Sequence, residues 1–488
     1  MASFSEIVEE ARLSARALLD YGDNFFNPTV RLGVTGLSRA GKTVFITALV
    51  HGLARGGRFP VLESLATGRI ARARLEPQPD DAVPRFAYEN HLRTLIEQRR
   101  WPNSTTDISE LRLVIDYQRQ NGADRTLTLD IVDYPGEWLL DLPLLNKSYE
   151  QWSAESLALS RQEPRVRLAA HWHEHLATLD PQAHEDEQAT LTAARLFTDY
   201  LRACRDERFA MSLLPPGRFL MPGNLAGSPA LTFAPLDVPV DGSAPDRSLW
   251  AMMRRRYEAY KDVVVRPFFR DHFSRLDRQI VLVDALAAFN AGPEALHDLE
   301  AALAGILDCF RIGRSTFFSN LFRPRIDRIL FAATKADHLH HSSHDRLEAI
   351  LRRMLDPAAT RAEVAGAAVD VVALAAVRAT REAQVQRGRD KLPSILGTPV
   401  KGEVAGDETF DGETEVATFP GDLPVHLDAL FQGDGAFRGL TTASAEKADF
   451  RFLRFRPPLL ESDDADGPAL PHIRLDRALQ FLIGDRLQ

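Results

Sequence analysis

The sequence predicts an α/β fold: a mostly parallel sheet with helices on both faces, a large, mostly helical insertion and a small C-terminal β/α module. Three observations predict it. The β-branched run Thr29–Thr35 meets a glycine-rich turn and a helix. Strands alternate with helices between residues 278 and 394. The long polar, helical texture of residues 143–277 separates these two α/β parts.

The first elements are expected in the following order. Residues 1–28 form an N-terminal amphipathic helix, because apolar and charged positions alternate there at helical spacing. Residues 29–142 form the first part of the sheet domain. Within it, residues 111–117 and 127–133 are predicted as strands joined by a turn that contains Asn121-Gly122, a strong hairpin signal.

Residues 278–394 complete the sheet domain after the insertion at 143–277. The expected strands and helices are strands 279–284, 328–333 and 370–375 and helices 293–310 and 343–355. Residues 395–488 are rich in glycine and aspartate, contain short β-like pieces and end in a helix from Leu475 to Gln488. This last part is the predicted C-terminal module.

Composition narrows the class of protein. The chain has 488 residues, of which 45% are hydrophobic and 26% charged, as in soluble globular proteins. Its net charge of −9 disfavours nucleic acid as the main partner. No stretch is apolar over the ~18–20 residues of a membrane helix, and acidic residues occupy the positive region of a signal peptide. Two cysteines without metal-type spacing fit a reducing compartment, so a cytoplasmic protein is expected.

An arginine-rich run, Arg254–Arg278, stands out against the acidic balance. Basic side chains on helices are most often solvated faces. The run is also a candidate contact for an anionic partner or for the inner membrane, at which a cytoplasmic protein would be peripheral.

The turn after the first strand has the pattern G-x-x-x-x-G-K-[ST]. Such a P-loop wraps phosphate oxygens with backbone N–H groups and the N-terminus of the next helix, so glycine is needed where a Cβ would clash. The lysine contacts the β- and γ-phosphates, and the threonine hydroxyl binds Mg²⁺. The residues expected to hold the phosphates are Gly36, Ser38, Arg39, Ala40, Gly41, Lys42, Thr43 and Val44.

The motif Asp133-Tyr-Pro-Gly136 ends the second hairpin strand. An acidic residue at a strand end holds Mg²⁺ through a water molecule, which is the role expected for Asp133. Gly136 lets a backbone N–H approach the γ-phosphate. Asp133 and Thr43 together predict a magnesium site that is typical of P-loop nucleotide-binding proteins.

Thr334-Lys335-Ala336-Asp337 directly follows a predicted strand and indicates a guanine base. The carboxylate of Asp337 would accept hydrogen bonds from N1–H and the 2-amino group of guanine, whereas adenine presents an acceptor at N1. The stem of Lys335 would cover the face of the base, and Thr334 belongs to the same loop. The loop after the last strand is expected to contact guanine O6 through backbone N–H groups of Ala376, Val377 and Arg378.

A threonine just before the first hairpin strand could close over Mg²⁺ and the γ-phosphate in the triphosphate state only. Thr105 is the first candidate, and Thr106 is the alternative. Glu137 follows Gly136, where small GTPases commonly place a glutamine that orients the attacking water. Arg39 lies inside the phosphate loop, where an arginine can stabilise charge that develops during phosphoryl transfer.

With these motifs, the chain resembles the YcjX-like family of bacterial P-loop proteins. The resemblance rests on Gly36–Thr43, Trp101-Pro102, Asp133–Trp138, Thr334–Asp337 and the tail Pro471–Asp485, so it spans almost the whole chain. It implies a GTP-binding protein with a helical insertion, associated with bacterial stress genes.

The motifs and the resemblance predict a slow, magnesium-dependent GTPase switch that binds GTP and GDP, with Arg39, Lys42, Thr105, Gly136 and Glu137 as its catalytic residues. A nucleotide-bound scaffold with little hydrolysis is the alternative that Glu137 keeps open. A small-molecule kinase is disfavoured because Thr334–Asp337 would then have no task. We also expect a protein partner or a homodimer, since a dimer contact could turn Arg39 onto the phosphates.

Overall fold

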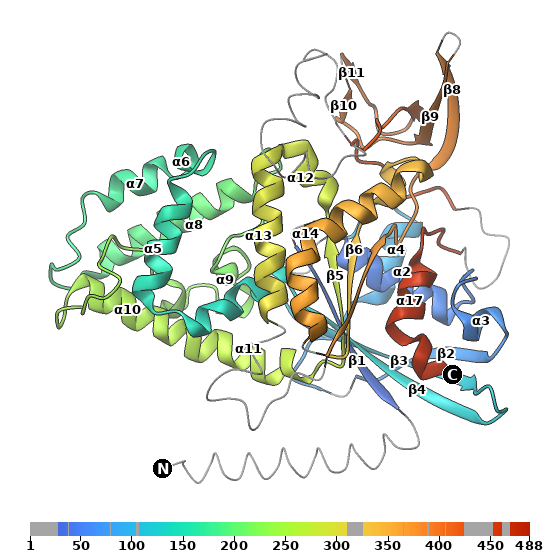
Figure 1. Cartoon of the computed structure of the whole chain (residues 1–488), viewed down its shortest axis with the longest axis horizontal. Coiled ribbons are helices and arrows are strands. Elements are labelled where there is room, and N and C mark those ends of the chain that lie inside the picture. Colours follow the sequence, from blue (N-terminus) through green and yellow to red (C-terminus); the bar gives the residue numbers. More distant parts are fainter. Residues whose placement is uncertain are drawn as a thin grey trace.

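A seven-stranded sheet organises the protein (Figure 1). The computed structural model describes residues 28–37, 39–78, 80–103, 107–309, 326–364, 366–387, 390–405, 407–423, 452–460 and 469–488. The strand order is β2-β3-β4-β1-β5-β6-β7. β4, β1, β5, β6 and β7 run parallel to their neighbours in this series, which confirms the predicted mostly parallel sheet.

Four of the five parallel strands, β1, β4, β6 and β7, end at motifs that the sequence singled out. The bounds of the five strands are β1 Thr29–Gly36, β4 Asp124–Asp133, β5 Arg278–Val283, β6 Arg328–Ala333 and β7 Ala368–Ala373. β5 is buried along its whole length, because helices cover both faces of the sheet. The predicted strands of the second half of the domain are therefore confirmed within one or two residues.

The antiparallel edge begins with the predicted hairpin. β3 (Ser109–Gln118) pairs antiparallel with β4, and Gly122 in the turn has φ 84°, a conformation that glycine adopts without strain. A further strand, β2 (Ile70–Glu76), pairs antiparallel with β3 and was not predicted. Its side chains are exposed or half-buried, as befits an edge strand.

Two hydrophobic layers cover the sheet, and the strands divide their side chains between them with a period of two. On one face, Leu32, Ile280 and Leu330 pack with α2 (Lys42–Ala54) and α17 (Leu475–Ile483). On the other face, Val281 and Phe331 pack with the helices that precede and follow β6. These are α12 (Ala285–Ala291), α13 (Pro293–Cys309) and α14 (His344–Val364).

Shorter elements complete the sheet domain around the phosphate-loop helix. They are α3 (Glu63–Ala66), α4 (Tyr88–Ile96), the 3₁₀ turns Ala336–His338 and His341–Ser343, and the 3₁₀ turn Gly484–Leu487 after α17. The segment that follows β4 is an 11-residue 3₁₀ helix, η1 (Gly136–Asn146). It leads directly into the insertion.

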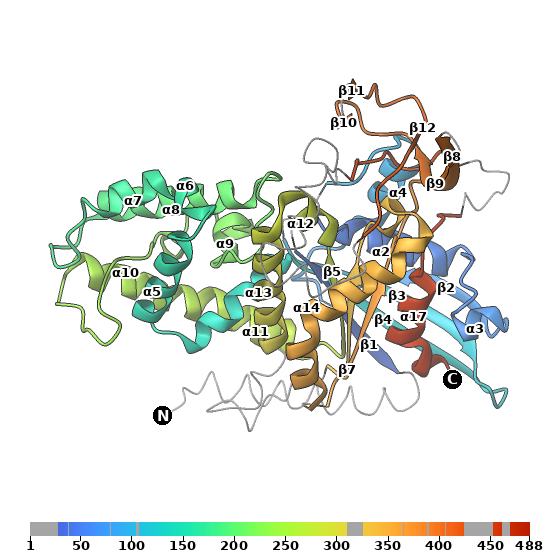
Figure 2. The same ribbon diagram turned by 45° about the horizontal axis from the view of Figure 1, so that its top comes forward.

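The insertion lies to one side of the sheet, beyond α13 (Figures 1 and 2). Its helices are α5 (Tyr149–Ser160), α6 (Arg165–Leu168), α7 (Ala170–Leu176), α8 (Glu187–Arg205), α9 (Gly217–Leu220), α10 (Leu249–Tyr260), the π-helix Lys261–Val265 and α11 (Arg266–Asp271). Three short 3₁₀ turns, Gly223–Leu225, Pro229–Leu231 and Phe273–Arg275, join them. The predicted mostly helical insertion is thus confirmed.

Buried aromatic rings form the centre of the insertion. Trp152 stacks on Tyr257 with ring centroids 5.2 Å apart and meets Phe233 edge-on at 5.3 Å. This cluster is continuous with the layer of α13 and α14 on the sheet. The insertion therefore shares one hydrophobic core with the sheet domain rather than hanging from a flexible linker.

The C-terminal part contains a small sheet and a helix that returns to the large sheet. β8 (Arg381–Arg387), β9 (Asp390–Gly397) and β12 (Val416–Thr418) form one antiparallel sheet, and β10 (Val404–Ala405) pairs with β11 (Glu408–Thr409). The predicted boundary between residues 394 and 395 falls inside β9. α17 packs on β6 and β7. The division of the chain into domains remains a prediction.

Two expectations concern the ends and the membrane. The expected helix over residues 1–28 lies almost wholly outside the described residues. Within the described part of the chain, none of the helices combines the length and apolarity that crossing a bilayer requires.

Arg278 fastens α17 to the sheet. This fully buried arginine ion-pairs with Asp327 and Asp485 and donates to the carbonyl oxygen of Leu482. Arg278→Met should lower the free energy of unfolding by about 2–4 kcal/mol, because it breaks buried charge-assisted contacts and leaves the Leu482 carbonyl without its donor. Urea unfolding followed by circular dichroism measures the loss.

A matched control uses the same two carboxylates. Arg486 lies 3.4 Å from Asp327 and 3.7 Å from Asp485, but its side chain is solvated. Arg486→Met should cost less than about 1 kcal/mol. Equal losses for the two variants would show that burial of Arg278 is not what secures the helix.

Candidate functional site

The phosphate loop joins β1 to α2. Gly41 has φ 83°, a left-handed conformation that favours glycine. Gly36 is needed for a different reason, since a Cβ atom there would lie 2.8 Å from the carbonyl oxygen of Leu282 in β5. Arg39 also has a positive φ, 62°. A side chain in that conformation is strained, and such strain is concentrated at ligand-binding sites.

Lys42 and Thr43 open α2. Lys42 is buried, and its Nζ donates to the carbonyl oxygen of Gly36 at 3.3 Å, so the ammonium group lies within the loop. Thr43 and Ala40 are buried as well. The N-terminus of a helix presents free N–H groups and a positive dipole end, which suits an anion. Val44 is half-buried, and Ser38 lies outside the described residues.

The Asp133–Gly136 segment lies directly against the phosphate loop. Asp133 is fully buried at the end of β4, which pairs in parallel with β1. Thr35 donates its hydroxyl to the carbonyl oxygen of Tyr134 at 3.2 Å. At Gly136, a Cβ would lie only 2.4 Å from the carbonyl oxygen of Gly36. No other residue type fits at Gly136 without displacing backbone, so the two motifs meet here.

The Thr334–Asp337 loop is held at the ends of β5 and β6. Lys335 has φ 60°, and its Nζ forms an ion pair with Asp284, which follows β5. Asp337 is buried, and its Oδ2 accepts the N–H of Ala379 at 2.8 Å. One carboxylate oxygen is thereby fixed while the carboxylate keeps acceptor capacity for further donors. Thr334 is buried beside them.

The loop after β7 is fixed by the C-terminal segment. Ala375 and Ile473 form an antiparallel bridge with N···O distances of 2.8 and 3.1 Å. Arg378 donates its N–H to the carbonyl oxygen of Pro471 at 2.7 Å. Of the two other predicted residues, Val377 is buried and Ala376 is half-buried. The loop therefore depends on residues almost a hundred positions away.

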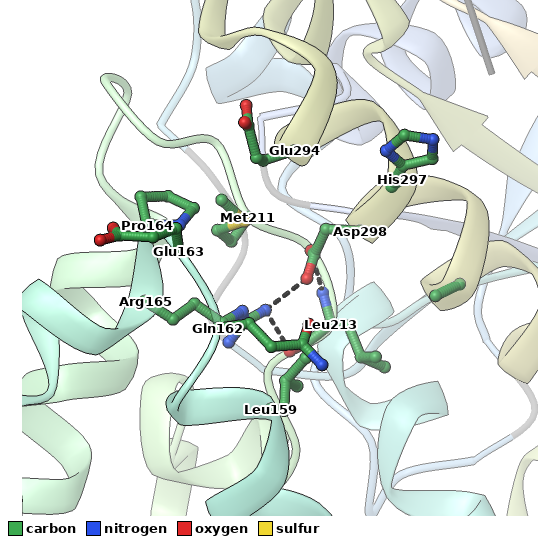
Figure 3. Close-up of a pocket in the computed structure, with 11 residues that line it drawn as sticks. Leu159, Gln162, Glu163, Pro164, Arg165, Met211, Leu213, Glu294, His297 and Asp298 are labelled. Carbon is green, nitrogen blue, oxygen red and sulfur yellow. Dashed lines mark hydrogen bonds and ion pairs between the residues drawn. The ribbon is translucent and has the colours of Figure 1, made fainter. Parts of the chain in front are cut away.

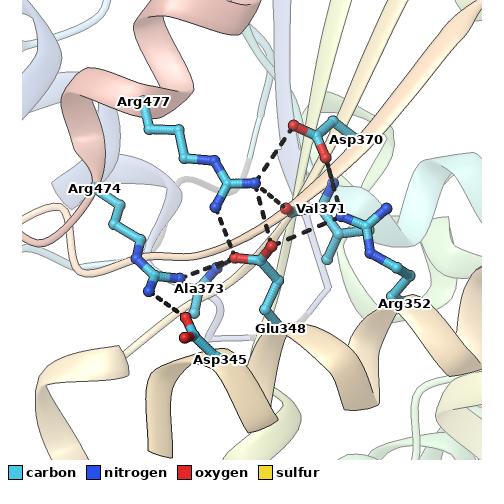
Figure 4. A network of polar contacts seen from close by, with 8 residues as sticks. All are labelled: Asp345, Glu348, Arg352, Asp370, Val371, Ala373, Arg474 and Arg477. Carbon is cyan, nitrogen blue, oxygen red and sulfur yellow. Dashed lines mark hydrogen bonds and ion pairs between the residues drawn. The ribbon is translucent and has the colours of Figure 1, made fainter. Parts of the chain in front are cut away.

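A charged network fastens that C-terminal segment (Figure 4). Glu348 of α14 accepts from Arg474 at 2.9 Å and from Arg477 at 3.1 Å. Arg352 reaches Asp370 of β7 at 3.0 Å, and Arg477 lies 3.7 Å from the same carboxylate. α14, β7 and the segment before α17 are thus tied together behind the two loops expected to contact a base.

Thr105 and its alternative Thr106 lie outside the described residues. The residues that flank them are fixed by other parts of the chain. Trp101 donates its Nε1–H to the carbonyl oxygen of Phe455 at 2.6 Å. On the other side, a Cβ at Gly223 of the insertion would lie 3.1 Å from Oδ2 of Asp107. Trp101 is thus held by the C-terminal part, and Asp107 lies against the insertion.

The insertion also supplies charged partners to Glu137 and Arg39. Glu137 is buried with its Oε1 3.8 Å from Nη2 of Arg205. Arg39 is half-exposed and pairs with Glu207 at 2.5 Å. Glu207 also receives Arg454 of the C-terminal part at 3.1 Å. In this arrangement the guanidinium of Arg39 is directed toward the insertion.

The buried contact between η1 and the insertion was not predicted from the sequence. A Cβ at Gly217 would lie 2.0 Å from the carbonyl oxygen of Glu137. Asp141 accepts the N–H of Gly217 at 2.7 Å and the hydroxyl of Tyr260 at 2.5 Å. Burial raises the pKa of Asp141 to about 6. The available signal was a single acid inside the apolar run that follows Glu137.

A cavity of about 240 Å³ lies between the insertion and α13 (Figure 3). Its centre is the buried ion pair between Arg165 and Asp298. Arg165 also donates to Tyr200 at 3.1 Å and to the carbonyl oxygen of Leu213 at 2.9 Å, and Asp298 accepts the N–H of Leu213. None of the residues expected to contact phosphate or base lines this cavity. The ion pair at this cavity connects the insertion to α13.

The residues present fit a magnesium ion at the phosphate loop. Mg²⁺ takes oxygen ligands and is usually held by one or two protein groups together with substrate phosphates. The hydroxyl of Thr43 and the carboxylate of Asp133 are oxygen donors, both buried at the same edge of the sheet. In a second group, His341 and Glu382 are exposed and His340 is half-buried, and these residues already bond one another or a neighbouring serine.

Comparison with known proteins identifies relatives over nearly the whole length. Residues 30–487 match the YcjX-like family, DUF463. The chain is similar to the "Ras-like GTPase YcjX" of Escherichia coli (strain K12), with 38% identity over 94% of this chain and 96% of that protein. It is also similar to the "Ras-like GTPase YcjX" of Shewanella oneidensis, with 34% identity over 94% of this chain and 95% of that protein.

The raised pKa of Asp141 predicts a pH dependence of stability. The ordinary pKa of this carboxyl is 3.8, and its pKa in the native state is about 6. Between these two pH values the native state holds a proton that the unfolded chain has lost. This stabilisation is fully present below pH ~4 and disappears as the pH rises through 6, a loss of at most about 3 kcal/mol. Asp141→Asn does not titrate and should lack the decline. Urea unfolding at pH 4.5 and 7 tests this.

Asp237 provides the control for Asp141→Asn, because it is exposed and pairs only at the surface with Arg161. Asp237→Asn should keep the pH profile of the unmodified protein. Parallel profiles for the unmodified chain and Asp141→Asn would contradict the assignment of the proton to Asp141.

Proposed function

Because the chain belongs to the YcjX-like family, DUF463, we propose that it binds GTP and GDP with Mg²⁺ and hydrolyses GTP slowly as a nucleotide-dependent switch. The observation that carries the proposal is the gathering of three motifs at one edge of the sheet. Lys42 and Asp337 follow β1 and β6, and Asp133 is the last residue of β4. Carboxyl ends of parallel strands meet at one edge, which is where ligands bind in open α/β sheets.

The phosphate and magnesium roles follow from burial and position. Lys42 exchanges its bond to the Gly36 carbonyl for the β- and γ-phosphates, and N–H groups of the loop and of α2 donate to their oxygens. Thr43 and Asp133 hold Mg²⁺, with Thr105 or Thr106 closing over it. Mg²⁺ supplies positive charge that neutralises the phosphate oxygens. Gly136 brings its N–H to the γ-phosphate beside Gly36.

The base roles rest on Asp337 and Lys335. The carboxylate of Asp337, fixed by the N–H of Ala379, accepts from N1–H and the 2-amino group of guanine. Lys335 lies against Asp284 with its stem along the base. Backbone N–H groups of Ala376 and Val377 are the donors proposed for guanine O6, whereas the predicted N–H of Arg378 is already bonded to the carbonyl oxygen of Pro471. The C-terminal segment supports them from behind.

Slow hydrolysis follows from Glu137. A carboxylate at this position is negative, and it lies near Arg205 rather than being available to orient a water molecule. Arg39 is a candidate transition-state residue, and it must first leave Glu207 to reach the phosphates. If neither group assists, the protein is a nucleotide-bound scaffold. Single-turnover hydrolysis of GTP, compared with ATP, separates the switch from the scaffold.

The switch would act through the insertion, because η1 follows Gly136 and its Asp141 is bonded to Gly217 and Tyr260. A protein partner or a second copy would respond to that movement, in a bacterial stress response. Contact between Arg254–Arg278 and an anionic membrane is less favoured. Arginines of this run pair with carboxylates within the described part of the chain: Arg255–Glu185, Arg256–Glu187, Arg266–Asp262 and Arg270–Asp271.

Base specificity should change at Asp337. We expect Asp337→Asn to weaken GDP binding and to favour xanthosine diphosphate, since the C2 carbonyl of xanthine suits an amide donor and the 2-amino group of guanine does not. Competition against a fluorescent GDP measures the preference. Adenine nucleotides should compete poorly with the unmodified protein. Equal competition by ATP would rule out the guanine assignment.

Phosphate binding should depend on Lys42. Lys42→Ala removes a buried charge-assisted contact worth at least ~1.5–3 kcal/mol, or more than a tenfold loss of GTP affinity. The sheet and insertion do not depend on this ammonium group, so thermal unfolding should change little. Lys401→Ala, an exposed lysine of the small C-terminal sheet region, is the control and should bind GTP normally. Unchanged GTP affinity in folded Lys42→Ala would exclude the phosphate-loop assignment.

A further inference from the structure

Arg218 is a buried arginine of the insertion without an anionic partner. Among the described residues, three arginines are exposed by 9% or less, and the other two, Arg165 and Arg278, each form ion pairs. The Nη1 atom of Arg218 is buried without a hydrogen-bond partner, and no carboxylate of the described chain lies within ion-pair distance of it. Such burial is unfavourable for a charge, so it calls for a function.

The guanidinium of Arg218 is held by an aromatic ring. Its Cζ lies 3.2 Å from the centroid of the Trp138 ring. Trp138 is the second residue after Gly136, so the arginine rests on the segment that contacts the phosphate loop. A cation–π stack is less directional than an ion pair and leaves the N–H donors of the guanidinium available to other acceptors.

The backbone places Arg218 close to the phosphates. Gly217 touches the carbonyl of Glu137, and Gly136 touches the carbonyl of Gly36 at the start of the loop. The two contacts are made by the consecutive residues Gly136 and Glu137, whose Cα atoms are ~3.8 Å apart.

The carboxylates nearest to Arg218 form no ion pair with it. Asp141 is occupied by Gly217 and Tyr260, and it acts on Arg218 only through space. Asp107, which follows the threonine segment, acts on Arg218 only over a longer distance. The guanidinium thus lies on the segment that follows Gly136, and its Nη1 has no acceptor among the described residues. An anion that arrives at this segment is its natural partner.

Arg39, unlike Arg218, already has a carboxylate partner. Its guanidinium is 52% exposed and pairs with Glu207, so its charge is already compensated. Moving it to a phosphate requires that pair to break. Arg218 gives up only its stack on Trp138.

We propose that Arg218 is the arginine that the insertion supplies in cis to the γ-phosphoryl group of GTP during hydrolysis. This rests on the proposed GTPase function. In the step, a water oxygen forms a bond to the γ-phosphorus, the bond from that phosphorus to the β–γ bridging oxygen breaks, and GDP keeps its electron pair. The products are GDP, phosphate and a proton released to solvent. Arg218 donates hydrogen bonds to the γ-oxygens and the bridging oxygen, and it transfers no proton.

The experiment compares full-length Arg218→Ala with the unmodified protein. Arginine contacts contribute ~10³–10⁵ in rate when fully engaged, and we expect the single-turnover GTP rate to fall at least ~10-fold. Affinities for GTP and GDP should change less than ~3-fold. Binding of GDP with aluminium fluoride, which imitates the transferring phosphoryl group, should be lost. Added guanidinium should restore part of the Arg218→Ala rate.

Two further variants make the result specific. Arg208→Ala, an exposed arginine of the same insertion, should keep the unmodified rate. Arg218→Lys keeps the charge without the planar fork and should remain slow. If thermal unfolding shows that Arg218→Ala is not folded, the GTP hydrolysis rate of Arg218→Lys and the binding of GDP with aluminium fluoride to that variant decide the question.

Three results would overturn the proposal. Arg218→Ala could hydrolyse GTP at the unmodified rate, or it could lose GDP affinity as much as rate, which would indicate a structural role. Alternatively, Arg39→Ala alone could lose the rate and the aluminium fluoride binding. Failure of the proposed function looks different: the unmodified protein would then bind no guanine nucleotide or would not hydrolyse GTP at all.

Discussion

The contact between Gly136 and the Gly36 carbonyl is the constraint on which the arrangement of the site depends. A Cβ at Gly136 would come within 2.4 Å of backbone, so the chain after β4 can cross the phosphate loop only as glycine. The same kind of contact recurs one residue later, where Gly217 lies on the carbonyl of Glu137. Backbone atoms are therefore stacked in three layers: the phosphate loop, the start of η1 and the insertion. A shift in one layer displaces the next, since none has a flexible side chain to absorb it.

This stacking explains why the insertion shares a core with the sheet domain. A rigid contact at Gly217 is useful only if the insertion cannot drift away from α13. The aromatic cluster around Trp152 and Tyr257 provides that rigidity, and the buried pair of Arg165 and Asp298 fixes the joint. Buried ion pairs add little net stability but strongly disfavour alternative arrangements when one partner is displaced. The joint therefore favours one orientation of the insertion.

Local motifs in the sequence predicted the parallel strands and the positions of the candidate ligand-binding residues. This was possible because a phosphate loop or a hairpin is encoded within about ten residues. The hairpin turn at Gly122 is an example. The edge strand β2 was missed because its side chains are solvated and carry charges, so no buried face marks it. Asp141 and Arg218 could not be predicted. Their partners lie more than seventy residues away along the chain, and only the folded arrangement shows that a buried charge lacks one.

One carboxylate connects the C-terminal part to the phosphate loop and the insertion. Glu207 of the insertion binds Arg39 of the phosphate loop and Arg454 of the C-terminal part at once. Both arginines are about half-exposed, so each pair alone is weak, but together they connect three segments at a single oxygen. Glu403 also binds Arg454. If Arg39 left Glu207, Glu207 would still be paired with Arg454, which Glu403 holds in place. The phosphate-loop arginine is thereby connected to the C-terminal part as well as to the insertion, so the proposed nucleotide-dependent change would have two separate surfaces on which to act.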